Sequence, residues 1–310
     1  MSVPGSHLAD YRKYLDPRVL ARIAALDLRA RLIVEGIMSG MHRSPYQGIS
    51  VEFAQHRPYV PGDDIRHVDW KVLAKTDRIY LKQYQEETNL QLVLLVDTSQ
   101  SMTYGSVGDS DARWTKLDHA TAIAASLSYM ALGQQDSVGL IVADSELRRF
   151  IRPANSPGQW KQVIAELTQS PRDRQTHLGK ALEQAAEKLT HRSLIVVLSD
   201  FFDNIDNILR GLRHVRHRRH EVIAMQVLDP DELSFPFEDP TRFEGLEASG
   251  TLLTDPKALR ASYLEHLHAA VSRLRTSCRG MRIDFVQMNS GDMLDVSLST
   301  FLANRAASMR

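Results

Sequence analysis

Three oxygen-bearing side chains, Asp97, Ser99 and Ser101, directly follow a mostly apolar run at residues 90–96. The run is short, partly β-branched and without helical periodicity, which is typical of a strand buried on both faces of a parallel sheet. In extended backbone, residues two apart point the same way, so the carboxylate and the two hydroxyls can converge. Such hard oxygen donors suit Mg²⁺ or Mn²⁺ better than Zn²⁺. An ordinary polar turn explains these residues equally well on their own.

Two later segments favour a metal site over a turn. Thr176 lies at the start of an amphipathic helix expected at 176–189, and a second apolar run at 194–198 ends in Ser199 and Asp200. Parallel strands bring their carboxyl ends to one edge of a sheet, where ligand sites of open α/β sheets lie. We therefore expect Asp200 at the same edge as the first group of oxygens.

Together these pieces resemble the metal-ion-dependent adhesion site (MIDAS) of von Willebrand factor type A domains. That site has the pattern Asp-x-Ser-x-Ser, followed by a Thr and then an Asp. The resemblance implies that Asp97, Ser99, Ser101 and Thr176 are direct or near-direct ligands of Mg²⁺ or Mn²⁺. It implies that Asp200 acts through water. The alternative is a metal-free remnant of such a site.

Alternating strands and helices predict an α/β fold with three layers, in which helices cover both faces of a mostly parallel central sheet. We expect two regions: residues 1–88, with an N-terminal helix and a small β-rich part, and residues 89–310, which resemble a von Willebrand factor type A domain. Helices are expected at about 16–38, 114–134, 160–167, 176–189, 206–215, 256–278 and 293–302. Further strands are expected at 78–84, 136–143, 149–152, 222–228 and 281–288, and a polar loop at 102–113.

A second resemblance begins before the first buried strand. The residues that carry it are Tyr59, Pro61-Gly62-Asp63, Arg66, Asp69-Trp70, Ala74, Lys82 and Glu86-Glu87, continued by Leu94-Leu95-Val96-Asp97, Thr115-Lys116-Leu117, Asp136 to Leu140 and Asp229 to Leu233. This pattern is similar to the signature of the domain-of-unknown-function 58 family, over roughly residues 12–300. Read physically, the charged residues between Tyr59 and Trp70 brace a turn, which is the alternative explanation of that part.

Composition narrows the class of protein. The chain has 310 residues, with 38 Lys plus Arg and 38 Asp plus Glu, so its formal net charge is zero. This balance gives no general affinity for nucleic acids or membranes. The single cysteine, Cys278, excludes an internal disulfide framework. With no apolar run long enough to cross a bilayer, we expect a soluble cytoplasmic protein, the shorter type in a family whose members often carry membrane-spanning helices.

Two classes of function remain. The sequence contains none of the Gly-rich phosphate loop, the dinucleotide fingerprint and the Gly-x-Ser-x-Gly elbow. The family resemblance implies a binding module: an adaptor or co-chaperone that links a MoxR-type AAA+ ATPase to a client protein through a metal-bound partner carboxylate. The alternative is a metal-dependent hydrolase of phosphoesters using Asp97, Ser99 and Asp200. It would need a base or a second set of metal ligands near Asp97, such as Asp203 or His177.

A dense basic run, Arg213 to His220, falls at the end of the helix expected at 206–215. Cations there interact favourably with the helix dipole, which makes a solvated helix end the simpler explanation. The alternative is a docking patch for an acidic partner.

Overall fold

The computed structural model describes residues 16–21, 25–41, 56–58, 80–82, 90–109, 112–169, 177–244 and 250–308. The chain forms two compact units, one from residues 1–43 with 90–310 and the other from residues 44–89. In the smaller unit, β1 (His56–Pro58) pairs antiparallel with β2 (Tyr80–Lys82). Most of the family signature between Tyr59 and Glu87, as well as Thr176, lies outside the described residues.

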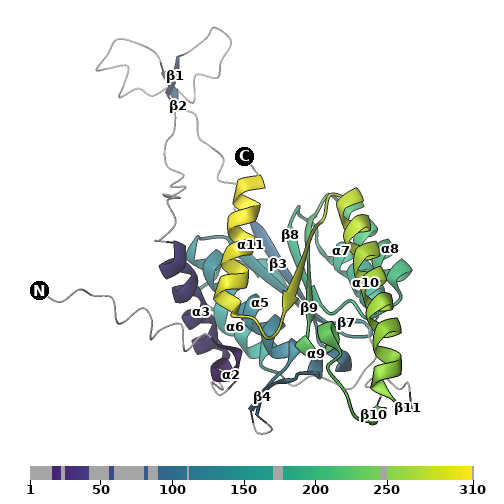
Figure 1. Ribbon diagram of the computed structural model, residues 1–310. Helices are drawn as coiled ribbons and strands as arrows, with labels where there is room; N and C mark the ends of the chain where they lie inside the picture. Colours follow the sequence, from purple (N-terminus) through teal and green to yellow (C-terminus); the bar gives the residue numbers. More distant parts are fainter. Residues whose placement is uncertain are drawn as a thin grey trace, which may run out of the picture. The chain divides into compact units, whose positions relative to one another are not determined.

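A six-stranded sheet forms the centre of the larger unit (Figure 1), with strand order β12-β9-β8-β3-β6-β7. Five strands are parallel, and β7 runs antiparallel along the edge. The strands are β3 (Gln91–Asp97), β6 (Ser137–Ala143), β7 (Leu147–Ala154), β8 (Leu194–Ser199), β9 (Glu221–Leu228) and β12 (Asp284–Asn289). This topology confirms the predicted α/β class with a mostly parallel sheet.

The central strand β3 is buried on both faces, as its apolar run predicts. Leu92, Leu94 and Val96 belong to one hydrophobic core, while Val93 and Leu95 belong to the other. Because side chains alternate along a strand, this single segment contributes to the packing of both helical layers. The end of β3 is therefore fixed from above and below.

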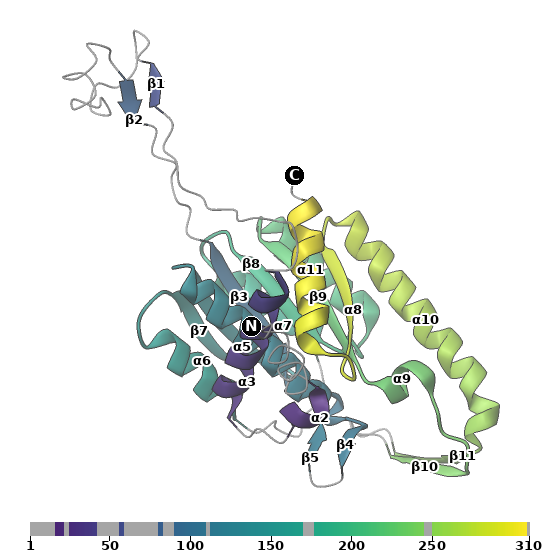
Figure 2. The same ribbon diagram turned by 60° about the vertical axis from the view of Figure 1, so that its left-hand side comes forward.

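Helices cover both faces of this sheet (Figures 1 and 2). One layer contains α3 (Leu26–Met41), α5 (Lys116–Gly133), α6 (Gln159–Leu167) and α11 (Leu294–Ser308), with the short α2 (Pro17–Leu20) beside it. The other contains α7 (Leu178–Lys188), α8 (Ile205–His217) and α10 (Pro256–Gly280). Among the described helices, none is long and apolar enough to cross a membrane.

Several elements differ from the sequence-based expectations. The helix expected from residue 16 is interrupted after α2, and α3 packs on α5 and α11 in the larger unit. The expected polar loop at 102–113 contains the 3₁₀ helix η3 (Gln100–Thr103) and the hairpin of β4 (Val107–Asp109) and β5 (Ala112–Trp114). Between β9 and α10, the chain also forms α9 (Pro230–Ser234) and the hairpin of β10 (Thr241–Glu244) and β11 (Thr251–Thr254). These short elements lack the periodicity that identifies longer ones.

Candidate metal and partner site

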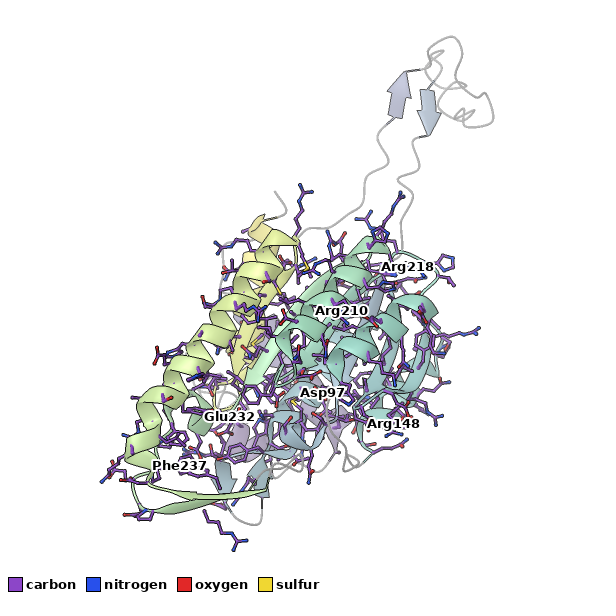
Figure 3. The ribbon with its side chains drawn as sticks, turned by 90° about the vertical axis from the view of Figure 1, so that its right-hand side faces the viewer. Asp97, Arg148, Arg210, Arg218, Glu232 and Phe237 are labelled. Atoms are coloured by element: carbon purple, nitrogen blue, oxygen red, sulfur yellow. The ribbon has the colours of Figure 1, made fainter. Side chains whose placement is uncertain are left out.

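The candidate site lies where the order of strand addition reverses. After β3 the chain adds β6 and β7 on one side, then returns to add β8, β9 and β12 on the other. Ligands of open α/β sheets bind beyond the carboxyl ends of the strands at such a switch point. Asp97 ends β3 and Ser199 ends β8, so both strands that flank the switch point finish in polar side chains (Figure 3).

Asp97 forms the centre of the first group of oxygens and is 1% exposed. Its Oδ1 accepts a 2.9 Å hydrogen bond from the backbone N–H of Ser99, which closes an Asx-turn directly after the strand. Its Oδ2 accepts a 2.6 Å hydrogen bond from the hydroxyl of Ser199, across the switch point. The hydroxyl oxygens of Ser99 and Ser101 are 3.2 Å apart. The first three predicted ligands are therefore neighbours.

Asp200 lies near Asp97 but is bound to a cation from the chain itself. Its Oδ2 accepts a 2.7 Å hydrogen bond from the ammonium of Lys116, and both side chains are fully buried. The same ammonium donates a 2.6 Å hydrogen bond to Glu232 and lies 4.8 Å from the centre of the Phe202 ring. The fifth predicted ligand, Thr176, lies outside the described residues.

Sequence reasoning did not identify Ser199, Lys116 and Glu232 as site residues. One signal was available, because Lys116 is the first residue of α5. A cation at the N-terminus of a helix is disfavoured by the helix dipole, so it needs a specific anionic partner. Its two carboxylates come from segments more than 80 residues away in sequence. No local pattern could therefore identify them.

Backbone strain marks the end of β8. Phe201 has φ of +58°, in the left-handed region that non-glycine residues rarely adopt. It is held there by two turns: its own N–H donates to the Ser199 hydroxyl at 2.9 Å, and the next N–H, of Phe202, donates to Asp200 Oδ1 at 3.0 Å. Strained residues of this kind concentrate at functional sites, because surrounding contacts must impose them.

Burial and neighbouring charges shift the pKa values of Asp97 and Lys116. Burial and the nearby Asp200 raise the pKa of Asp97 to about 7, against the hydrogen bonds from Ser199 and Ser99. Burial alone would lower the pKa of Lys116, but Asp200 and Glu232 together raise it above its ordinary value. At neutral pH the ammonium therefore stays charged.

The oxygen donors of the site are of the chemical type that hard divalent cations prefer. Asp97 supplies a carboxylate, and Ser99 and Ser101 supply two neighbouring hydroxyls. Within the described ranges, no three His, Cys, Asp or Glu side chains are grouped to hold a metal ion. A cation here would thus depend on the serine hydroxyls and on a single direct carboxylate. The pKa of Asp97 near neutrality is consistent with a carboxylate that lacks a nearby positive charge of its own.

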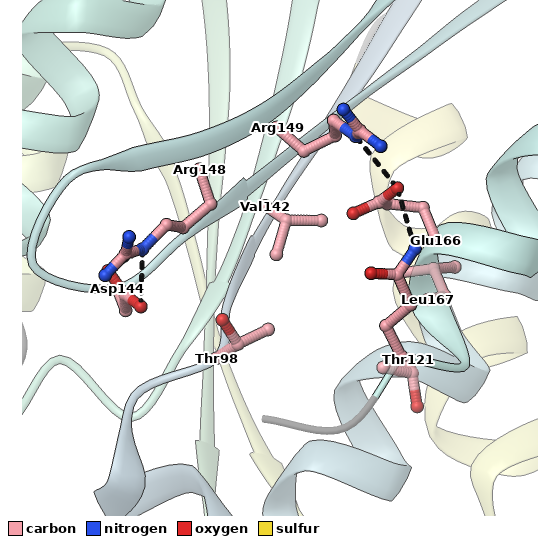
Figure 4. A pocket seen from close by; sticks show the side chains of 9 residues that line it. Thr98, Thr121, Val142, Asp144, Arg148, Arg149, Glu166 and Leu167 are labelled. Carbon is pink, nitrogen blue, oxygen red and sulfur yellow. Dashed lines mark hydrogen bonds and ion pairs between the residues drawn. The ribbon is translucent and has the colours of Figure 1, made fainter. Parts of the chain in front are cut away.

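A pocket of about 240 Å³ lies beside the site and includes Thr98 in its wall (Figure 4). Its buried Asp144 accepts hydrogen bonds of 2.8 and 2.9 Å from Arg148 Nε. Arg149 pairs with Glu166 at 3.1 Å on the other side of the pocket. Arg148 Nη1 also lies 3.7 Å from Glu146, and its Nη2 is buried with no hydrogen-bond partner among the described residues. The guanidinium of Arg148 is therefore already paired with two carboxylates of the chain.

Comparisons with known proteins identify relatives along most of the chain. The family model described as "Protein of unknown function DUF58" matches residues 55–273. The uncharacterized proteins Rv1480 of Mycobacterium tuberculosis and Mb1516 of Mycobacterium bovis are each 31% identical over 225 residues, which is 71% of this chain and 68% of theirs.

Solved structures with a similar fold are more distant. BatB from Bacteroides thetaiotaomicron is 15% identical with a TM-score of 0.45, and the match covers 70% of this chain and 99% of that one. The SpRpn10 VWA domain is 13% identical with a TM-score of 0.40, and covers 67% and 93% of the two chains. Similarities at this level do not extend to function.

Proposed function

The chain belongs to the DUF58 family, and from this premise we propose that it is a protein-binding adaptor that holds a divalent cation for a partner's carboxylate. The observation that supports the proposal is the convergence of Asp97, Ser99 and Ser101 at the switch point of the sheet. The proposed cation is Mg²⁺ or Mn²⁺. The proposed partners, from the family resemblance, are a MoxR-type AAA+ ATPase and a client protein.

Each residue has a distinct part in this proposal. A bound divalent cation would supply an open coordination position for the partner's acid. Asp97 and the two serines bind it, while the Ser199 hydroxyl orients the Asp97 carboxylate from the neighbouring strand. Lys116 neutralises Asp200, so two buried carboxylates can stand close together without both needing the metal.

The hydrolase alternative receives no support from the described residues. Among them, neither of the bases considered, Asp203 and His177, is hydrogen-bonded to Asp97 or Asp200. The Asp203 carboxylate instead accepts from the backbone of Asn204, and His177 lies exposed before α7. We therefore treat hydrolysis as an outcome to be tested.

The deciding experiment is a Mg²⁺ and Mn²⁺ titration of the full chain followed by thermal unfolding. We expect metal to raise the melting temperature of the wild type, because a ligand at about 100 times its Kd adds about 2.7 kcal/mol. The double variant Ser99→Ala, Ser101→Ala should lose this response. The matched control is Ser126→Ala, Ser128→Ala, which removes two buried hydroxyls that bond only to helix carbonyls in α5.

Binding and turnover are measured on the same proteins. Asp97→Ala should abolish capture of the MoxR-type ATPase or its client while the protein remains folded by circular dichroism. An equal metal response in the serine variant and its control would refute the site. Metal-dependent turnover of a phosphoester such as p-nitrophenyl phosphate, lost in Asp97→Ala, would establish the hydrolase instead.

A further inference from the structure

Six arginines gather around one hollow of the larger unit, which we call the basic groove. It has a volume of about 690 Å³, and two acids, Glu221 and Asp284, also line it. The arginines are Arg192, Arg216, Arg218, Arg219, Arg282 and Arg305. They come from four separate segments of the chain, and the basic run seen in the sequence supplies only half of them.

The basic groove lies at the edge of the sheet opposite the candidate metal site. Apart from Arg305 of α11, its residues precede or begin β8, β9 and β12, whereas Asp97 ends β3. Figure 3 shows Arg218 and Asp97 at the two ends of the sheet. The eight residues of β9 span about 26 Å at ~3.3 Å per residue, which separates the two sites.

Hydrogen bonding to the carbonyl groups at helix ends does not explain why so many arginines line the basic groove. The C-terminal carbonyls of helices favour nearby cations, and α8 and α10 both end here. Among the described arginines of the basic groove, only Arg216 bonds a carbonyl at a helix end: its Nε donates to Met281, the C-cap of α10, at 3.2 Å, and its Nη1 also donates to the carbonyl of His220, beyond α8, at 2.7 Å. Arg218, Arg219 and Arg282 are left without a structural partner of this kind.

The carboxylates of the basic groove are also occupied by other arginines. Glu221 is bound by Arg192 at 2.6 Å and by Arg305 at 3.4 Å, and Arg305 also binds Asp284. In the part of the chain that the structure describes, Arg218, Arg219 and Arg282 have no ion pair or hydrogen bond from their side chains. The basic groove therefore carries positive charge that no internal anion neutralises.

Two of these unpaired arginines occupy strained backbone. Arg219 has φ of +66° and Arg282 has φ of +55°, each just after the end of a helix. Glycine is the residue preferred at such positions, because a side chain in left-handed backbone costs about 1 kcal/mol. Arginine therefore stands at two positions where glycine is preferred, and both of these arginines line the basic groove.

We propose that the basic groove binds an acidic, carboxylate-rich segment of a partner protein, as a second binding site separate from the one at Asp97. Arginine pairs with carboxylates in this hollow already, at Glu221 and Asp284. None of the described residues that line the basic groove is aromatic, so it offers no surface for stacking nucleic-acid bases. The chain would then have binding sites at both edges of its sheet.

The test measures binding of a fluorescein-labelled hexaglutamate peptide to the full chain by fluorescence anisotropy. The double variant Arg219→Gly, Arg282→Gly should raise the Kd at least tenfold. Its melting temperature should be equal to or higher than that of the wild type, since glycine removes the backbone strain. The control Arg210→Gln, Arg213→Gln removes two exposed charges of α8 that do not line the basic groove.

Each outcome of this experiment either supports or refutes binding of an acidic segment in the basic groove. Selective loss in the glycine variant, with binding that weakens as NaCl rises, supports the proposal. No binding by the wild type, or equal loss in the control, refutes it. Tighter binding of single-stranded oligonucleotide than of hexaglutamate, through the same arginines, assigns the basic groove to nucleic acid and also overturns the proposal. Asp97→Ala should leave peptide binding unchanged, so failure of the metal site does not affect this result.

Discussion

At the scale of the residue, the candidate site contains its own counterion, the buried ammonium of Lys116. Lys116 bonds two carboxylates while its side chain is 0% exposed. Buried ion pairs add little net stability compared with apolar packing, but removal of one member leaves a charge without compensation. Lys116 is therefore a residue on which the arrangement of Asp200 and Glu232 depends.

Replacement of Lys116 by Met should lower the free energy of unfolding by about 3–5 kcal/mol at neutral pH, because the buried Asp200 and the partly buried Glu232 lose their cation. Urea unfolding measures this. The control is Arg149→Met, which breaks an ion pair whose arginine is 62% exposed and should cost under about 1 kcal/mol. A Lys116→Met loss no greater than that of the control would show that the ammonium is dispensable.

Asp97 should make stability depend on pH. Its pKa is raised to about 7 by burial and by Asp200, whereas an unfolded aspartate titrates near 3.9. Between these values the folded state binds the extra proton, so this group makes unfolding progressively easier as pH rises from about 4 to about 7, by at most about 1.4 kcal/mol per pH unit. Above pH 7 its contribution is constant.

Denaturant unfolding of wild type and Asp97→Asn at pH 5, 6, 7 and 8 measures this dependence. The asparagine variant should show a weaker decline from pH 5 to pH 7. Added Mg²⁺ should stabilise the wild type more at pH 8 than at pH 5, because protons compete with the cation for the carboxylate. Parallel pH profiles for the two proteins would contradict the assignment.

At the scale of the element, the contact between α7 and α8 depends on glycines. A Cβ on Gly211 would lie 2.6 Å from the carbonyl oxygen of Gly179 and 2.9 Å from Leu182 Cβ. The helix backbones therefore cross closely enough to exclude side chains. These two helices cover the face of the sheet below β3 and β8, so their spacing determines how the strand ends are supported.

Gly211→Ala should lower the free energy of unfolding by about 1–3 kcal/mol, because the overpacking exceeds the gain in helix propensity. The control is Gly133→Ala near the end of α5, where a Cβ would have no atom within 4 Å. That change should be neutral or stabilising by up to about 1 kcal/mol. Thermal unfolding compares the two, and equal melting temperatures would show that the helices can move apart.

At the scale of the whole molecule, the sequence predicts what is periodic and misses what is assembled from distant segments. The alternation of strands and helices predicts the layered fold, and the apolar run of β3 predicts burial on both faces, which the structure confirms. Asp97, Ser99 and Ser101 do lie together, but they are brought together by the Asx-turn and the 3₁₀ helix η3 that follow β3, and not by the extended backbone that the sequence analysis assumed. The sequence could not predict the contacts of Lys116, or that Arg282 and Arg219 line the same groove, because both arise only when remote segments meet.

The register of β3 with β8 has a mechanical consequence. The two strands are paired from Leu92 to Val96, and a side-chain bond joins their last residues. The ends of β3 and β8 are therefore held together, which restricts movement of the main chain at Asp97 and at Asp200. Lys116 reaches Asp200 through a long, rotatable side chain and also bonds Glu232 of α9, so a change of charge at Asp200 would act on α5 and α9 through this one side chain.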